Sequence, residues 1–127
     1  MGANILIADD SLLTRKAIRR MLEMIGLETG EVLEAENGSE AIGIMQSNRV
    51  DLVIADLNMP VMDGREMIDR MRGNDATRHI PVVVVSTESS GARIEGLLAG
   101  GVKDYLHKPF KPEDFRDLIN RTIGAGA

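Results

Sequence analysis

The sequence predicts an α/β fold, a doubly wound sheet of five parallel strands with helices on both faces. Short apolar runs alternate with segments of helical periodicity along the 127 residues. Two of these runs, residues 51–55 and 80–85, are apolar almost throughout, as expected for strands covered on both sides in a parallel sheet. The connections between the runs are too long for hairpins, which favours crossovers and a doubly wound sandwich. We expect the strand order 2-1-3-4-5.

The chain starts with an apolar run at residues 4–8, which predicts the first strand. From Ser11 the pattern becomes helical and stops at Gly26, a residue type that commonly follows a helix end. The inward stripe of this helix consists of Ile18, Met21, Leu22 and Ile25. Glu23 and a basic cluster lie off this stripe. We expect the cluster to be mostly a solvated face, with a docking surface for a partner protein as the alternative: Arg15, Lys16, Arg19 and Arg20.

Residues 31–35 alternate weakly in polarity, which predicts a strand near an edge of the sheet. Asn37 and Gly38 form a turn signal, and Ser39 is the expected N-cap of a helix that continues to Gln46. The inward side chains of this helix are expected to be Ala41, Ile42 and Met45.

A third helix is expected to begin at Asp63 and Gly64 and to end at Gly73, before the valine run 80–85, which is the strongest strand signal. The helix over residues 92–99 has glycines within and beside it. We expect this helix to be loose, because an interior glycine costs about 1 kcal/mol relative to alanine.

The last two elements continue the same alternation. A short strand at residues 104–107 precedes a helix that starts at Pro112, a residue type favoured in the first helical turn. The inward side chains of this helix are expected to be Phe115, Leu118 and Ile119. Residues 124–127 are expected to be a frayed tail.

The composition limits the class of protein. A hydrophobic content of 43% fits one compact domain over residues 1–127. The chain has no cysteine, no leader pattern and no apolar run near the roughly 18 residues of a membrane span, so we expect a cytoplasmic protein without membrane insertion. A net charge of -5 and 2% aromatic residues argue against direct nucleic-acid binding.

Acidic side chains follow two of the predicted strands. Asp9 and Asp10 come directly after the first strand and Asp56 after the third, and the expected strand order places these ends side by side. Three carboxylates stay ionised together only if a cation joins them, and hard oxygen ligands favour Mg²⁺, or Mn²⁺, over zinc. The simpler alternatives are a solvated acidic turn at Asp9 and Asp10, and a turn or capping role for Asp56.

Two more polar residues follow strands that end at the same edge. Lys108 comes after the fifth strand and Ser86 after the fourth. A lysine can pair with a phosphoryl group and a serine hydroxyl can meet a phosphoryl oxygen. The set therefore suits phosphoryl transfer, in which the protein mainly positions the group and neutralises charge. The alternatives are an ordinary surface lysine and a turn-forming serine.

Together these residues resemble the receiver domain of two-component response regulators, in particular the single-domain, CheY-like regulators with a flavodoxin-like fold. The resemblance rests on Asp9–Asp10, the string from Asp56 to Gly64, Ser86 after a valine run, and Tyr105 three residues before Lys108-Pro109-Phe110. It covers nearly the whole chain, and its parts occur in order at strand ends.

The resemblance implies a role for each of these residues. Asp56 would accept a phosphoryl group from a sensor histidine kinase, a phosphotransfer protein or a small phosphodonor. Asp10 and Asp56 would bind the metal directly, Asp9 through water and Asn58 through its backbone carbonyl. Lys108 would bind the phosphoryl group and precede a cis proline bond.

The resemblance also implies how long the phosphorylated state lasts and how it is passed to a downstream protein. The side chains of Asn58 and Glu88 would tune hydrolysis of the phosphorylated aspartate. Ser86 would bond to the phosphoryl group and draw in the loop that follows it, so that the Tyr105 ring moves as part of a two-state switch. A downstream protein would bind the fourth helix, fifth strand and fifth helix, on a face that includes Arg93, Lys103, Tyr105 and Lys111.

The implied protein is a stand-alone switch, monomeric or dimerising when phosphorylated, with self-catalysed phosphoryl transfer and autodephosphorylation rather than conventional enzymatic turnover. Chemotaxis is one candidate pathway. The alternatives are a receiver domain cut from a larger regulator, a module that binds partners without phosphorylation, and a phosphatase with an aspartyl-phosphate intermediate. Such phosphatases usually carry a second acid where this chain has Asn58.

Overall fold

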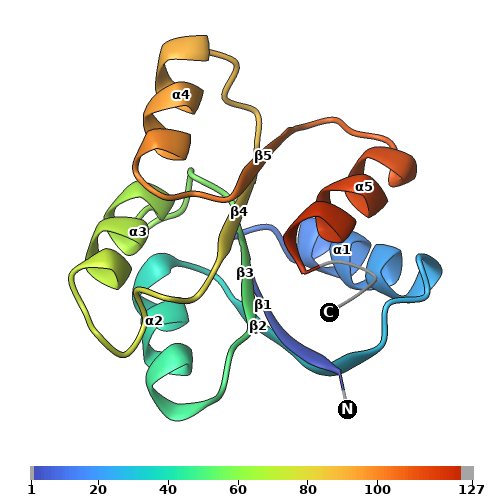
Figure 1. The fold of residues 1–127 in the computed structure, drawn as a ribbon, viewed down its shortest axis with the longest axis horizontal. Helices are drawn as coiled ribbons and strands as arrows, with labels where there is room; N and C mark the ends of the chain where they lie inside the picture. Colours follow the sequence, from blue (N-terminus) through green and yellow to red (C-terminus); the bar gives the residue numbers. More distant parts are fainter. Residues whose placement is uncertain (1, 124–127) are drawn as a thin grey trace.

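The computed structural model describes residues 2–123, in which five strands alternate with five helices as the sequence predicts (Figure 1). The strands are β1 (Ala3–Ala8), β2 (Thr29–Ala35), β3 (Leu52–Ala55), β4 (Val82–Ser86) and β5 (Asp104–His107). The helices are α1 (Leu12–Met24), α2 (Gly38–Ser47), α3 (Gly64–Arg72), α4 (Gly91–Ala99) and α5 (Pro112–Thr122). The predicted frayed tail at residues 124–127 lies outside the described residues.

The strands form one parallel sheet in the predicted order β2-β1-β3-β4-β5. In the central strand β3, Ala55 lies opposite Ala8 of β1 and opposite Val84 of β4. The carboxyl ends of these three strands therefore reach the same edge. From β1 the chain crosses to β2 on one side, and from β3 it crosses to β4 on the other, so the ends of β1 and β3 form the topological switch point.

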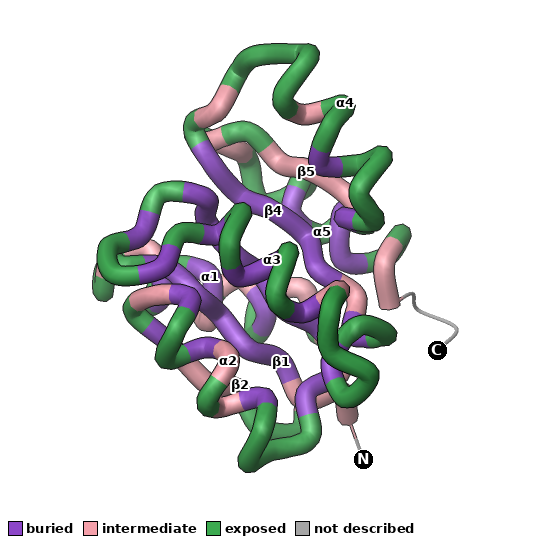
Figure 2. Tube along the Cα trace, turned by 90° about the vertical axis from the view of Figure 1, so that its left-hand side faces the viewer, coloured by how far each residue is buried: buried purple, intermediate pink, exposed green. Residues whose placement is uncertain are grey.

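Helices cover both faces of the sheet, with α1 and α5 on one face and α2, α3 and α4 on the other (Figure 1). Successive strand residues point to opposite faces and so feed two core clusters. The cluster beneath α1 and α5 includes Ile5, Ile7, Leu52, Ile54, Val83 and Val85. The opposite cluster includes Leu6, Ala8, Val53, Ala55, Val82 and Val84. Figure 2 shows β1 and β4 as buried segments inside the shell of helices.

The helix α4 is held less deeply than the other helices. Leu97 is the one buried residue of this fully described helix, and Leu98 beside it is 43% exposed. A shallow contact with the core is what the glycine-weakened pattern predicts for this segment. Among residues 2–123, no helix has both the length and the apolar composition needed to cross a membrane.

The predicted N-cap of α2 is wrong. Asn37, not Ser39, caps this helix, because the Asn37 side-chain oxygen accepts the N–H of Glu40 at 2.8 Å. Asn37 has extended backbone outside the helix, as an N-cap residue requires, whereas Ser39 already lies within the first turn. The caps of α1 and α3 are Ser11 and Asp63, at the predicted helix starts.

The buried ring of Phe115 provides a test of this core. Replacing Phe115 by alanine should destabilise the protein by about 3–5 kcal/mol, because the ring is fully buried between α5 and the sheet and its loss leaves a cavity. Urea denaturation followed by circular dichroism would measure the loss. The control Leu98→Ala, at a partly exposed site, should cost less than about 1 kcal/mol. Equal losses in the two variants would contradict this placement of Phe115.

Candidate functional site

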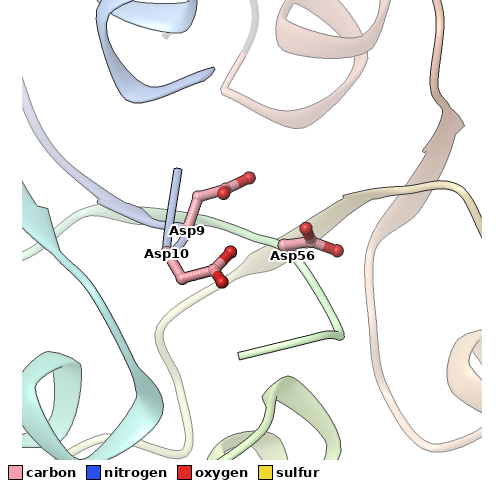
Figure 3. Close-up of side chains that lie close together, drawn as sticks. All are labelled: Asp9, Asp10 and Asp56. Carbon is pink, nitrogen blue, oxygen red and sulfur yellow. The ribbon is translucent and has the colours of Figure 1, made fainter. Parts of the chain in front are cut away.

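Three acidic side chains gather at the carboxyl edge of the sheet, as the sequence predicts. Asp9 and Asp10 follow β1, Asp56 follows β3, and one carboxylate oxygen from each lies within 4.8 Å of the other two. Figure 3 shows the three side chains side by side at these two strand ends. Asp9 and Asp56 are only 2% and 9% exposed, whereas Asp10 is exposed. Two buried carboxylates this close need a positive charge nearby.

Lys108, which follows β5, supplies a positive charge. Its Nζ donates hydrogen bonds to Oδ2 of Asp9 at 2.9 Å and to Oδ2 of Asp56 at 3.0 Å. Burial alone would lower the pKa of Lys108, but the hydrogen bonds and charges of Asp9 and Asp56 outweigh burial and raise this pKa above its usual value. The Lys108–Pro109 peptide bond is cis, as predicted. One ammonium among three carboxylates still leaves an excess of negative charge.

Backbone groups hold the other carboxylate oxygen of Asp56. Its Oδ1 accepts the N–H of Leu57 at 2.7 Å and that of Asn58 at 3.4 Å. The loop then folds back, so that the N–H of Gly64 donates to the Leu57 carbonyl at 2.9 Å. A Cβ on Gly64 would collide with the Asp56 carbonyl and lie 2.9 Å from the Leu57 Cα. A residue without a side chain is therefore required at the start of α3.

Ser86 ends β4, the strand next to β3, and is fully buried. Since Val84 lies opposite Ala55, Ser86 lies one residue beyond the level of Asp56 at the same edge. Its Oγ accepts the N–H of Glu88 at 3.3 Å, and its carbonyl accepts the N–H of Lys108 at 2.8 Å. Ser86 is thus held between the loop that follows β4 and the lysine that follows β5.

Tyr105 on β5 reaches the same loop. Its hydroxyl donates to the carbonyl of Glu88 and lies 3.1 Å from the carbonyl of Ser86. Burial is the largest of the causes that raise the pKa of Tyr105, so the phenol remains a protonated donor at neutral pH. The half-buried tyrosine therefore ties β5 to the segment between β4 and α4.

Arg15 is buried, so the prediction of a solvated face is wrong for this residue. Its Nη1 donates to the Asp9 carbonyl at 2.7 Å, and its Nε donates to Oε1 of Glu34 on β2 at 2.8 Å. Arg19 binds Oε2 of the same glutamate at 2.9 Å. The sequence could not reveal this group, because Glu34 meets α1 only when the helix packs against the edge strand β2. The one signal was a basic residue one turn after the acid pair.

Several other predicted residues lie on the surface. Arg93, Lys103 and Lys111 are exposed on the predicted partner face, and Asn58 is exposed in the loop after β3. The side chain of Glu88 is 19% exposed and lies 3.5 Å from Arg93 of α4, so the predicted hydrolysis-tuning position is connected to the predicted partner face.

The acid cluster fits a small divalent cation. Its side-chain ligands are hard oxygens with excess negative charge, and Mg²⁺ commonly takes one or two carboxylates and keeps several waters. Oxygens on opposite sides of one Mg²⁺ are about 4.2 Å apart. Oxygens within 4.8 Å of one another can therefore share an ion after a small shift or through water. Asp9, Asp10 and Asp56 could thus hold Mg²⁺ or Mn²⁺.

Comparison with known proteins agrees with this geometry. A family model described as "Response regulator receiver domain" matches residues 5–120. The chain is 34% identical over 124 residues to a chemotaxis protein CheY homolog of Campylobacter jejuni, an alignment that covers 97% of this chain and 94% of that protein.

Two solved structures extend the comparison. The chemotaxis response regulator CheY4 of Vibrio cholerae is 33% identical, with a TM-score of 0.84 over 96% of this chain and 99% of that chain. The receiver domain of a sensor histidine kinase from Pseudomonas aeruginosa is 27% identical, with a TM-score of 0.83 over 98% of this chain and 100% of that chain. That crystal structure has a magnesium ion coordinated in its active-site cleft. The predicted fold is confirmed.

We expect the ion pairs of Glu34 with Arg15 and Arg19 to make a pH-dependent contribution to the stability of the fold. Burial alone would raise the pKa of Glu34, but hydrogen bonds from Arg19 and Arg15, together with their charges, lower it. A carboxylate with a lower pKa in the folded protein stabilises the fold above its unfolded pKa of about 4.3, and this stabilisation is lost as the pH falls through the folded pKa.

Glu34→Gln should therefore cost about 1 kcal/mol near neutral pH, and the difference from wild type should shrink as the pH falls below about 4. Urea denaturation across this pH range would measure both effects. The control Glu95→Gln, at an exposed position on α4, should change little at any pH. A loss in Glu34→Gln that did not vary with pH would contradict the assigned ion pairs.

Proposed function

Since the chain belongs to the response regulator receiver family, we propose that it is a stand-alone signalling switch that accepts a phosphoryl group on Asp56. One observation carries the proposal: the Lys108 ammonium bridges Asp9 and Asp56 beside the three-carboxylate cluster. The residues proposed as carboxylate nucleophile, as cation for the phosphoryl group and as ligands for a divalent metal therefore lie close together. The family match supports the same assignment.

The proposed reaction transfers a phosphoryl group from a phosphohistidine of a sensor histidine kinase or phosphotransfer protein, or from a small phosphodonor. A carboxylate oxygen of Asp56 attacks phosphorus. With a phosphohistidine donor, the P–N bond breaks with its electron pair returning to the imidazole nitrogen, and a P–O bond to Asp56 forms; with a small phosphodonor, the bond from phosphorus to the donor breaks and the donor leaves with the electron pair. Lys108, kept charged by its raised pKa, is placed to pair with the phosphoryl oxygens.

The proposed metal site consists of the side chains of Asp9, Asp10 and Asp56 with the backbone carbonyl of Asn58, and Mg²⁺ bound there would neutralise charge on the phosphoryl oxygens. The closeness of the three carboxylates supports this assignment. The structure of the Pseudomonas receiver domain with magnesium in its cleft supports it from outside the chain.

Hydrolysis ends the proposed signal. Water attacks phosphorus, the P–O bond to Asp56 breaks, and inorganic phosphate leaves. Asn58 lies two residues after Asp56, and Glu88 lies two residues after Ser86. In this proposal their side chains tune access of water to the phosphorylated aspartate. Self-catalysed transfer and hydrolysis of this kind set the lifetime of the phosphorylated state. They do not amount to conventional enzymatic turnover.

The proposed output runs through Ser86 and Tyr105. The Ser86 hydroxyl, now paired with the Glu88 N–H, is the group that would turn to a phosphoryl oxygen. The same segment accepts the Tyr105 hydroxyl at the Glu88 carbonyl, so movement of Ser86 changes what holds Tyr105. The shallow packing of α4 leaves it free to respond, because moving elements come from the less stable parts of a fold.

The proposed downstream partner is a protein that binds the face formed by α4, β5 and α5, with Arg93, Lys103, Tyr105 and Lys111 as contacts. We expect a cytoplasmic monomer before phosphorylation. The compared proteins include chemotaxis regulators and a receiver domain of a histidine kinase, so likeness alone does not select the pathway. Chemotaxis is a candidate pathway, because two of the compared proteins are chemotaxis regulators.

The first test is phosphorylation by acetyl phosphate or phosphoramidate, with and without Mg²⁺, measured by intact mass. Wild type should gain one phosphoryl group, about 80 Da, only with Mg²⁺, and Asp56→Asn should gain none. The control Asp63→Asn, an exposed carboxylate in the same loop, should be labelled as wild type. No labelling of wild type by either donor, or equal labelling of Asp56→Asn, would exclude Asp56 as the acceptor.

A second test addresses the switch. Tyr105→Phe keeps the ring and removes the hydroxyl that binds the Glu88 and Ser86 carbonyls, an interaction of about 1 kcal/mol. The equilibrium between the two conformations should therefore change about fivefold while phosphorylation of Asp56 continues. Amide NMR shifts of α4 and β5, with and without beryllofluoride, would measure this change. If Tyr105→Ala is phosphorylated normally and also responds as wild type, Tyr105 has no part in switching.

A further inference from the structure

The Arg15 guanidinium binds the peptide unit that joins the two acids of the cluster. Its Nη1 donates to the Asp9 carbonyl at 2.7 Å. This carbonyl and the N–H of Asp10 belong to one planar peptide unit. Fixing the carbonyl therefore restrains the N and Cα atoms of Asp10, from which its side chain leaves the backbone.

Asp10 depends on this backbone more than Asp9 does. The Asp9 N–H donates to the Ala35 carbonyl at 3.0 Å, and its carboxylate accepts from the Ser11 N–H at 2.9 Å and from Lys108. Asp10 is exposed, and within residues 2–123 no side-chain hydrogen bond orients its carboxylate. The position of its oxygens therefore depends on its backbone, and Arg15 holds one of the two peptide units that flank Asp10.

Glu34 in turn orients Arg15. One carboxylate oxygen of Glu34 accepts from the Arg15 Nε at 2.8 Å, and the other accepts from Arg19 at 2.9 Å. Arg19 also donates to the Val32 carbonyl at 2.9 Å, so the group is anchored on the edge strand β2. Arg15 is 8% exposed, and its guanidinium would not remain buried without these partners.

Charge and geometry make opposite predictions for this arginine. A positive charge near the acids repels a metal cation, so by charge alone Arg15 would weaken binding. Glu34 offsets that charge, while the hydrogen bond to the Asp9 carbonyl keeps the acids in place. If Arg15 strengthens metal binding, it must therefore do so by holding the acids in place and not by its charge.

We propose that Arg15, oriented by Glu34, is a positioning residue for the binding of a divalent cation by Asp9 and Asp10. The inference rests on the proposed function in one respect, namely that Mg²⁺ binds at the acid cluster. Residues that orient metal ligands from outside the coordination sphere typically change metal affinity by about 10–100-fold.

Calorimetric titration with Mg²⁺ would test the proposal. Arg15→Gln should raise the Mg²⁺ dissociation constant about tenfold, and Glu34→Gln should raise it by a smaller factor. These variants change the net charge in opposite directions, so an effect of charge alone would move the two dissociation constants in opposite directions. Glu34→Gln also keeps the proposal testable if Arg15→Gln does not fold.

Two variants serve as matched controls. Arg20→Gln makes the same charge change on an exposed part of α1. Arg72→Gln removes hydrogen bonds to the carbonyls of Arg78 and Gly101, at the opposite edge of the sheet, and so imitates a loss of general stability. Both controls should bind Mg²⁺ as wild type does, although thermal melting without Mg²⁺ should show that Arg72→Gln is less stable.

The outcomes separate this inference from the proposed function. Equal or tighter Mg²⁺ binding by Arg15→Gln, beside a wild type that binds Mg²⁺, would overturn the inference alone. Equal weakening in Arg72→Gln would overturn it as well, because general instability would then explain the effect. A wild type that does not bind Mg²⁺ would overturn the proposed function and this inference together.

Discussion

The shared ammonium of Lys108 is the interaction on which the site depends. Asp9 and Asp56 are buried carboxylates from neighbouring strands, and Lys108 binds one oxygen of each at 2.9 and 3.0 Å. Without it, two buried carboxylates would face each other with no neighbouring cation to offset their repulsion. The ends of β1, β3 and β5 must therefore be held together, and the two apolar clusters that cover the sheet do so.

The elements around this site differ in how deeply they pack into the core. The acids stand at the ends of β1 and β3, whose residues are among the most buried in the described chain. The helix α4 contributes one buried side chain. A site on rigid strands keeps its geometry, and a shallowly packed helix next to it can move at small cost. The structure thus combines a fixed centre for chemistry with a surface that can respond.

Two series of polar contacts start at the acid cluster, one reaching the edge strand β2 and the other reaching α4. Toward the edge strand β2, the Asp9 carbonyl is linked through Arg15 to Glu34. Toward α4, Lys108 is linked by its backbone to Ser86, the Ser86 hydroxyl to Glu88, and Glu88 to Arg93. The first set contains a partly buried ion pair and suits support of the site. The second passes through a loop and includes the half-buried Tyr105, which suits transmission of a change.

The sequence by itself determined the strands and helices, their order in the sheet and the convergence of Asp9, Asp10 and Asp56, because the spacing of apolar residues reports which faces are buried and parallel strand ends share one edge. Tertiary structure decided the partners of side chains. Arg15 has the spacing of a solvated residue but is buried against Glu34, nineteen positions away. Asn37 rather than Ser39 caps α2. Such contacts depend on how a helix packs against a strand, or on where the backbone leaves a helix, and local periodicity contains neither.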